Sequence, residues 1–199
     1  ASLGRRDQQV TRDELVAHAA ALAAAVDVPL NVDAERCFAD TPAGVAETVG
    51  LLAGTRAAGL SIEDYDPVAG AVEPLDVAAA RVAAAAEVAR AEGLVLTARA
   101  ENHLYGAGDL DDTIARLRAY RDAGAEVVYA PGLTDLADIA RLVEAVEVPV
   151  NVLATGAPPV PELASVGVRR VSTGGALARI AYGAARSAAR ELLDSAAGD

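Results

Sequence analysis

Acidic residues stand at the ends of two short apolar segments, where their spacing suits a divalent cation. Asp33 and Glu35 are two positions apart, so both side chains point to the same side of a strand. Glu63 ends the next segment and shares its parity with the small Ser61. Converging carboxylates repel one another unless a cation lies among them, and oxygen atoms are the ligands that Mg²⁺ prefers. The pattern therefore predicts a Mg²⁺ site held by Asp33, Glu35 and Glu63.

A third apolar segment ends with Arg99 and Glu101, which share one face. An arginine beside a cation site can bind a substrate carboxylate or phosphonate through two parallel hydrogen bonds. A single acidic residue at a strand end is more often a helix cap or part of a solvated loop, and we assign Asp40 and Asp64 to that class. Matched acids on two neighbouring strands, together with an arginine of inward parity, instead favour a joint site.

Four other residues have chemistry that the sequence leaves open. His103 lies in the loop 101–108 and is either a general acid or base or a solvated loop histidine. Asn102 and, as a weaker candidate, Asn151 at inward parity are predicted to hydrogen-bond substrate. Cys37 is either a small apolar filler or a reactive thiol.

Strands must position these residues, and six short segments rich in β-branched residues alternate with longer segments of helical period. The predicted strands are Val28–Glu35, Leu60–Tyr65, Leu94–Asn102, Glu126–Gly132, Val148–Ala154 and Val168–Gly175. A helix is expected over Thr11–Val26 before the first strand, and another over Gly174–Ala196 at the end. The alternation predicts a parallel sheet covered by helices, with the chemistry at the carboxyl ends of the strands.

Helix boundary signals agree with this order of elements. Thr41 precedes Pro42 as expected of an N-cap followed by proline in the first turn. Gly59, Gly93 and Gly124 each stand just before a predicted strand, where a left-handed C-cap would close the preceding helix.

An open doubly wound sheet and a closed (β/α)8 barrel are both compatible with alternating strands and helices. The six predicted strands are two short of a barrel, and the first helix would follow a strand that the sequence does not contain. The sequence also has no methionine and begins at Ala1. We therefore expect a (β/α)8 barrel that lacks its first two strands. Residues 1–199 would form one partial barrel domain, with 175–199 as a C-terminal helical segment.

Composition excludes several classes of function. All 17 basic residues are arginines, so Schiff-base catalysis, a pyridoxal-phosphate anchor and a Walker A loop are excluded. The net charge of −12 and the 3% aromatic content argue against a nucleic-acid partner. One cysteine cannot form an intrachain disulfide, and no apolar run is long enough to span a bilayer. We expect a cytoplasmic protein without a membrane partner.

The sequence resembles the isocitrate lyase/phosphoenolpyruvate mutase superfamily, and the resemblance covers essentially the whole chain. It rests on Pro-Leu-Asn-Val-Asp-Ala-Glu at 29–35, Ala-Gly-Leu-Ser-Ile-Glu-Asp at 58–64, Thr-Ala-Arg-Ala-Glu at 97–101, Tyr-Ala-Pro-Gly-Leu at 129–133, Pro-Val-Asn-Val-Leu at 149–153 and the stretch 167–178. The matches occur in the family's order and spacing.

The resemblance implies a (β/α)8 barrel, commonly a tetramer that exchanges a terminal helix, so a homo-oligomer (a dimer or tetramer) is expected. It also implies Mg²⁺ or Mn²⁺, bound largely through waters, and cleavage of a C–C or P–C bond beside an enolate. By position, Asp33, Glu35 and Glu63 match the metal residues. Asp7 matches an outer metal position, and Arg99 matches the arginine that binds the substrate.

Departures from the family pattern argue against some of the family's reactions. The segment 65–74 has neither the Cys- and His-containing loop of isocitrate and methylisocitrate lyases nor the Asn-rich loop of phosphonopyruvate enzymes. Mutases have a histidine where this chain has Ala130-Pro131. We expect a lyase that acts on a small 2-hydroxy or 2-oxo dicarboxylate, with Glu101 orienting Arg99 or the metal's waters. P–C chemistry and a non-catalytic binding or scaffold role are the alternatives.

Overall fold

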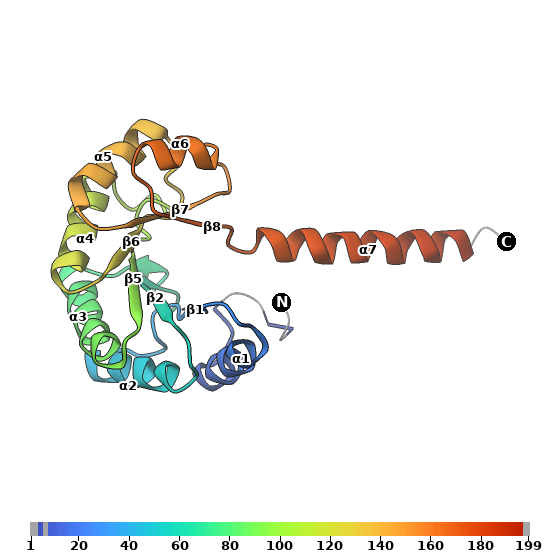
Figure 1. Ribbon diagram of the computed structural model, residues 1–199, viewed down its shortest axis with the longest axis horizontal. Coiled ribbons are helices and arrows are strands. Elements are labelled where there is room, and N and C mark those ends of the chain that lie inside the picture. The colour runs from blue at the N-terminus through green and yellow to red at the C-terminus, as the bar shows by residue number, and fades with distance from the viewer. Residues whose placement is uncertain (1–3, 6–7, 197–199) are drawn as a thin grey trace.

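A curled sheet of six parallel strands forms the body of the molecule in the computed structural model, which describes residues 4–5 and 8–196 (Figure 1). The strands pair in the order β1-β2-β5-β6-β7-β8. Their bounds are β1 Asn31–Asp33, β2 Gly59–Glu63, β5 Val95–Arg99, β6 Val127–Tyr129, β7 Val150–Leu153 and β8 Arg170–Ser172. The predicted parallel sheet is therefore confirmed, with each strand shorter than the segment that predicted it.

Helices lie along the convex side of the sheet and leave the concave side to the strands (Figure 1). They are α1 Arg12–Ala25, α2 Pro42–Ala53, α3 Leu75–Glu92, α4 Leu110–Asp122, α5 Leu136–Val146 and α6 Val160–Ser165. A doubly wound sheet would carry helices on both faces. The cover that α2 to α6 give to one face is instead that of part of a (β/α) barrel.

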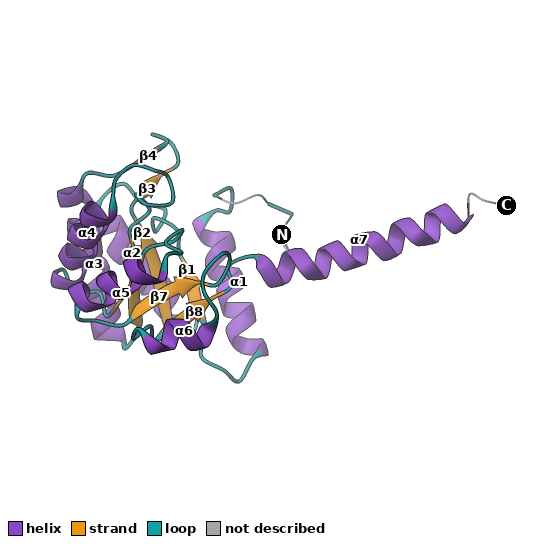
Figure 2. Ribbon diagram, turned by 90° about the horizontal axis from the view of Figure 1, so that it is seen from above, coloured by secondary structure: helices purple, strands orange, loops and turns teal. Residues whose placement is uncertain are grey.

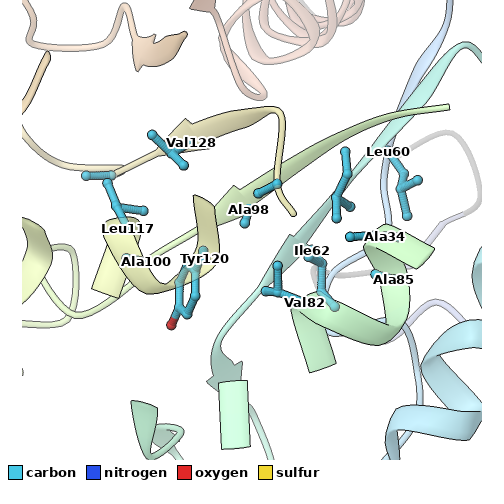
Figure 3. Close-up of a cluster of buried hydrophobic side chains, with 14 of the residues drawn as sticks. Ala34, Leu60, Ile62, Val82, Ala85, Ala98, Ala100, Leu117, Tyr120 and Val128 are labelled. Carbon is cyan, nitrogen blue, oxygen red and sulfur yellow. The ribbon is translucent and has the colours of Figure 1, made fainter. Parts of the chain in front are cut away.

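Alternation along the strands separates the apolar core from the polar interior. Leu60 and Ile62 of β2 and Ala98 of β5 face the helices, where they meet side chains such as Val82 of α3 and Leu117 of α4 (Figure 3). The residues between them in sequence point to the opposite face, because side chains alternate along a strand. Ser61, Glu63, Thr97 and Arg99 therefore lie on the concave side, paired in register as Ser61–Thr97 and Glu63–Arg99.

The helix boundaries confirm most of the predicted signals. The Thr41 side chain accepts a hydrogen bond from the nitrogen of Gly44, and Gly93 closes α3 with a φ of 72°. Gly124 follows α4 with a φ of 109°. The prediction for Gly59 was wrong, because this glycine lies inside β2. A Cβ there would stand 2.6 Å from the carbonyl oxygen of Val95, so close packing of β2 against β5 explains the glycine.

Two features depart from the compact pattern of alternating strands and helices. The segment after β2, which the sequence indicated only as a loop, contains the two-stranded hairpin of β3 (Tyr65–Asp66) and β4 (Ala71–Val72). Helix α7 (Ala176–Ala196) extends away from the sheet (Figures 1 and 2). Among the residues that the structure describes, no helix has the length and apolar character needed to cross a membrane.

Candidate functional site

Arg99 is surrounded by carboxylates at the carboxyl end of three neighbouring strand segments. Its guanidinium nitrogens lie 2.9 Å from Oδ2 of Asp33, 3.1 Å from Oε2 of Glu63 and 2.8 Å from Oε1 of Glu101. Asp33 ends β1, Glu63 ends β2, and Glu101 follows β5 by two residues. Parallel strands bring their carboxyl ends to one edge, which is why residues so far apart in sequence meet here.

Burial makes the charges of this cluster interdependent. Burial raises the pKa of Glu63 to about 8, against the lowering effect of Arg99 and with repulsion from Glu101 and Asp33. Burial also raises the pKa of Glu101, although Arg99 opposes it. For Arg99 burial would lower the pKa, but the carboxylates outweigh it and raise the pKa above its usual value. One buried guanidinium thus does not neutralise the surrounding acids.

The residues around the cluster fit a hydrated divalent cation. A pocket of about 90 Å³ is lined by Leu104, Tyr105 and six other residues, all polar or charged. A water occupies about 30 Å³, so the pocket has room for a cation with a few waters. No three acidic, histidine or cysteine side chains of the described residues are arranged as a direct metal cage. Mg²⁺ keeps several waters in protein sites, which suits such an open set of oxygens.

Glu35 comes from a loop with an unusual backbone, and it lines the same small pocket. Glu35, Cys37 and Phe38 have φ angles of 49°, 58° and 54°. These lie in the left-handed region, which residues other than glycine seldom adopt. Arg81 of α3 is fully buried and donates hydrogen bonds to the carbonyl oxygens of Ala39 (2.6 Å) and Arg36. These bonds hold the loop in the conformation that presents Glu35 to the pocket.

The Cys37 side chain faces the core rather than the pocket. It is fully buried, and burial raises the pKa of its thiol to about 12. The thiol is therefore protonated and shielded, which supports its interpretation as an apolar filler. The hydroxyl of Thr48 on α2 donates a hydrogen bond of 2.8 Å to the backbone carbonyl oxygen of Cys37.

Asp64 is not a solvated loop residue, and that expectation was wrong. Its side chain is 2% exposed and accepts hydrogen bonds from the backbone nitrogen of Glu101 (2.7 Å) and the hydroxyl of Tyr120 (2.5 Å). Arg116 donates to it at 3.2 Å. Tyr120 and Arg116 belong to α4, far along the chain, so no local pattern indicated this burial. Asp40, in contrast, is exposed and pairs with Arg36, as expected of a solvated residue.

Two further predicted residues, Asn102 and His103, lie in the loop after β5. Asn102 is fully buried and donates to Asp112 and Thr113 at the base of the loop after β5. His103 is half-buried in that loop, with its ring against the position of Gly132. Asp7 lies outside the described residues. Gln8, which the sequence did not single out, donates to Oε1 of Glu63 at 3.4 Å.

A larger pocket of about 550 Å³ opens on the concave side beside the cluster. Arg99 and Asp33 form its boundary with the small pocket, and residues of all six sheet strands or their ends line the rest. The ring of Tyr129 lies below the Arg99 guanidinium, 5.4 Å from it. Asn151 lines the pocket from β7 and donates to the hydroxyl of Ser172 at 3.0 Å. A small polar molecule can therefore reach Arg99 from this side.

Comparison with known proteins gives matches along almost the entire chain. The sequence model of a family described as phosphoenolpyruvate phosphomutase matches residues 1–193. An uncharacterized protein of Mycobacterium tuberculosis H37Rv, Rv1998c, is 33% identical over 94% of this chain and 69% of its own length. The 2-methylisocitrate lyase of Escherichia coli K12 is 31% identical over 79% of this chain and 56% of its own length. The oxaloacetate decarboxylase of Chromohalobacter salexigens is 28% identical over 96% and 68%.

Solved structures share the fold over the same range. A putative lyase/mutase from Burkholderia cenocepacia J2315 superimposes with a TM-score of 0.91 and 49% identity, covering 96% of this chain and 70% of that one. An oxaloacetate acetylhydrolase in complex with the product oxalate gives a TM-score of 0.87 and 28% identity, covering 98% and 71%.

Proposed function

Because the chain belongs to the phosphoenolpyruvate mutase family, within the isocitrate lyase/phosphoenolpyruvate mutase superfamily, we propose that it is a Mg²⁺-dependent lyase. Its substrate would be a small 2-hydroxy or 2-oxo dicarboxylate, cleaved at a C–C bond through an enolate. The observation that carries this proposal is the contact of Arg99 with the carboxylates of Asp33, Glu63 and Glu101. A relative named for oxaloacetate, which is a 2-oxo dicarboxylate, supports the substrate class.

Asp33, Glu35 and Glu63 would hold the cation, Mg²⁺ or Mn²⁺, with Asp7 at an outer position. The excess of carboxylates over guanidinium groups in the small pocket supports this assignment. The chemistry that the cation supplies is neutralisation of the charge that develops on the enolate oxygen. Of these residues Glu63 is buried, whereas the side chain of Asp33 is 64% exposed.

Arg99 would bind the substrate carboxylate through its planar fork of donors. Oε1 of Glu101 accepts a hydrogen bond of 2.8 Å from Nε of Arg99 and thereby orients the guanidinium. Asp64 in turn accepts a hydrogen bond from the backbone nitrogen of Glu101 and fixes its position. Asn151 would hydrogen-bond the substrate from the wall of the larger pocket, and Asn102 from the base of the loop after β5.

His103 is the residue proposed for proton transfer, and Glu101 is the catalytic candidate that orients Arg99 or the metal's waters. Burial raises the pKa of Glu101, and its 2.8 Å ion pair with Arg99 opposes that rise. His103 stands two residues farther along, and an imidazole is a common general acid or base. A loss of activity in His103→Gln with unchanged affinity for substrate would support a role in proton transfer.

The curled six-stranded sheet supports the proposal that the chain forms six of the eight strands of a (β/α)8 barrel. The exposed helix α7 supports the proposal of a homo-oligomer. The side chains of Leu177, Ile180, Tyr182, Leu192 and Leu193 are all more than half exposed on this helix. A second copy of the chain that covered them would give a dimer or a tetramer.

P–C bond chemistry is the alternative that a specific observation favours. The matching family is described as phosphoenolpyruvate phosphomutase, and a putative phosphonomutase of B. cenocepacia is 33% identical. Proton and phosphorus NMR of reactions with Mg²⁺ separates the possibilities. Cleavage of a C–C bond in oxaloacetate supports the lyase, whereas conversion of phosphonopyruvate supports P–C chemistry. Cation binding without turnover of any of these acids would favour a binding or scaffold role.

A further inference from the structure

Arg170 of β8 is a second arginine inside the curled sheet, and we propose that it binds the distal carboxylate of the substrate. The proposal rests on the proposed function and deepens it, because it selects dicarboxylates over monocarboxylates. Arg170 lines the same 550 Å³ pocket as Arg99.

The position of Arg170 places its guanidinium one layer below Arg99. Its backbone pairs with Asn151 of β7, yet Nη1 donates a hydrogen bond of 2.9 Å to Oγ1 of Thr97 on β5. The side chain therefore reaches across the interior of the curled sheet. Thr97 precedes Arg99 by two residues on the same face, and two residues of a strand rise about 6.6 Å. A four- or five-carbon dicarboxylate can bridge that interval with one carboxylate at each arginine.

The two arginines differ in how many carboxylates contact them. Arg99 already contacts three carboxylates. Arg170 has no ion pair within the described portion of the chain, and its single side-chain hydrogen bond there goes to a neutral hydroxyl. A guanidinium carries five N–H donors in a fork that matches a carboxylate. Arg170 thus retains donors and an unbalanced charge that a second substrate carboxylate would satisfy.

Asn151 supplies an independent sign that a ligand occupies this wall of the pocket. The residue is 3% exposed, and its Oδ1 is buried without a hydrogen-bond partner, while Nδ2 donates to Ser172. Buried carbonyl oxygens nearly always accept a hydrogen bond. Asn151 lies beside Arg170 in register, so the hydroxyl of a 2-hydroxy acid bound between the arginines is a suitable donor. The ligand class is therefore a 2-hydroxy or 2-oxo dicarboxylate of four or five carbons.

Calorimetric titration in Mg²⁺ with two ligands, malate and oxalate, tests the proposal. Malate has the length to reach both arginines, whereas oxalate reaches only Arg99. We expect Arg170→Met to weaken malate binding by about 10- to 100-fold, as loss of a charged hydrogen-bond pair should, and oxalate binding by less than about 3-fold. Arg169→Met removes the same charge from the adjacent exposed position and should leave both affinities unchanged.

The other outcomes are equally informative. Equal weakening of both ligands, or no weakening of malate, would overturn the assignment of Arg170 while leaving the proposed function intact. Failure of the unmodified chain to bind either ligand with Mg²⁺ would overturn the proposed function, and the inference with it. If Arg170→Met does not fold, Arg170→Lys keeps the charge without the planar fork. That variant should then show a selective loss of malate affinity, and retention of full malate affinity would contradict the proposal.

Discussion

The carboxylate of Asp64 accepts a hydrogen bond of 2.7 Å from the backbone nitrogen of Glu101. The residue that pairs with Arg99 is thereby fixed by a buried acid from the end of the neighbouring strand. Burial raises the pKa of Asp64, although the hydrogen bonds from Tyr120 and Glu101 and the charge of Arg116 oppose that rise. The position of Arg99 consequently depends on a network that begins in α4.

Replacing Asp64 with Asn should disturb both stability and the site. The amide keeps the size but loses the charge that receives three donors, and a charge-assisted hydrogen bond contributes about 1.5–3 kcal/mol. We expect a loss of about 3 kcal/mol in the free energy of unfolding, measured with urea, and weaker binding of oxalate in Mg²⁺. Asp111→Asn at an exposed site of the same α4 is the control. Unchanged oxalate affinity in Asp64→Asn would contradict the positioning role.

Glu63 should make the stability of the metal-free protein fall as pH rises. Its pKa is raised to about 8 in the folded chain from 4.5, mainly by burial, so the folded state holds a proton that the unfolded state releases. Stability should therefore decrease between roughly pH 4.5 and pH 8, where the folded state binds more protons. Thermal unfolding with EDTA at several pH values measures this slope.

Two variants separate Glu63 from the other acids in that experiment. Glu63→Gln should flatten the slope, because the amide does not titrate. Glu87→Gln, at an exposed position of α3, should keep it. An identical slope in the unmodified chain and Glu63→Gln would show that another group is responsible.

Arg81 and Glu73 form a buried ion pair of 3.2 Å that supports the loop of Glu35. Removal of one partner from such a pair typically costs about 3–5 kcal/mol, because the other charge stays buried and uncompensated. We expect Arg81→Met to lose that amount in urea unfolding. Because Arg81 and Glu73 contact each other, the double variant Arg81→Met/Glu73→Gln should lose less than the sum of the two single variants, even though Glu73 also pairs with Arg36. Simple additivity would argue against a coupled pair.

The apolar side of α7 should hold copies of the chain together. Ile180→Glu places a charge on that side and is expected to shift the molar mass from light scattering to that of a monomer, with the helix content retained. Arg190→Glu is the control: it changes the net charge by more than Ile180→Glu does, but it replaces an exposed residue that is already charged. It should leave the oligomer unchanged. A monomeric unmodified chain would contradict the proposed homo-oligomer.

The alternation of short β-branched segments with helical segments was enough to predict the parallel sheet. Side-chain parity along the strands predicted that Asp33, Glu63 and Arg99 meet, because alternation along a strand fixes the face of each side chain. The burial of Asp64 was not predictable in this way, since Tyr120 lies 56 residues away. Arg170 was not singled out either. Its side chain reaches across the sheet to Thr97, a contact between strands that sequence spacing does not encode.

Oxalate is the ligand that best reports on a cation-dependent site, because it resembles the enolate of a 2-oxo acid. Calorimetric titration of the unmodified chain should show binding with Mg²⁺ or Mn²⁺ and none with EDTA. Arg99→Gln should abolish the binding that the cation permits. Oxalate binding of equal strength in EDTA, or no binding with either cation, would contradict a cation-dependent site for 2-oxo and 2-hydroxy acids.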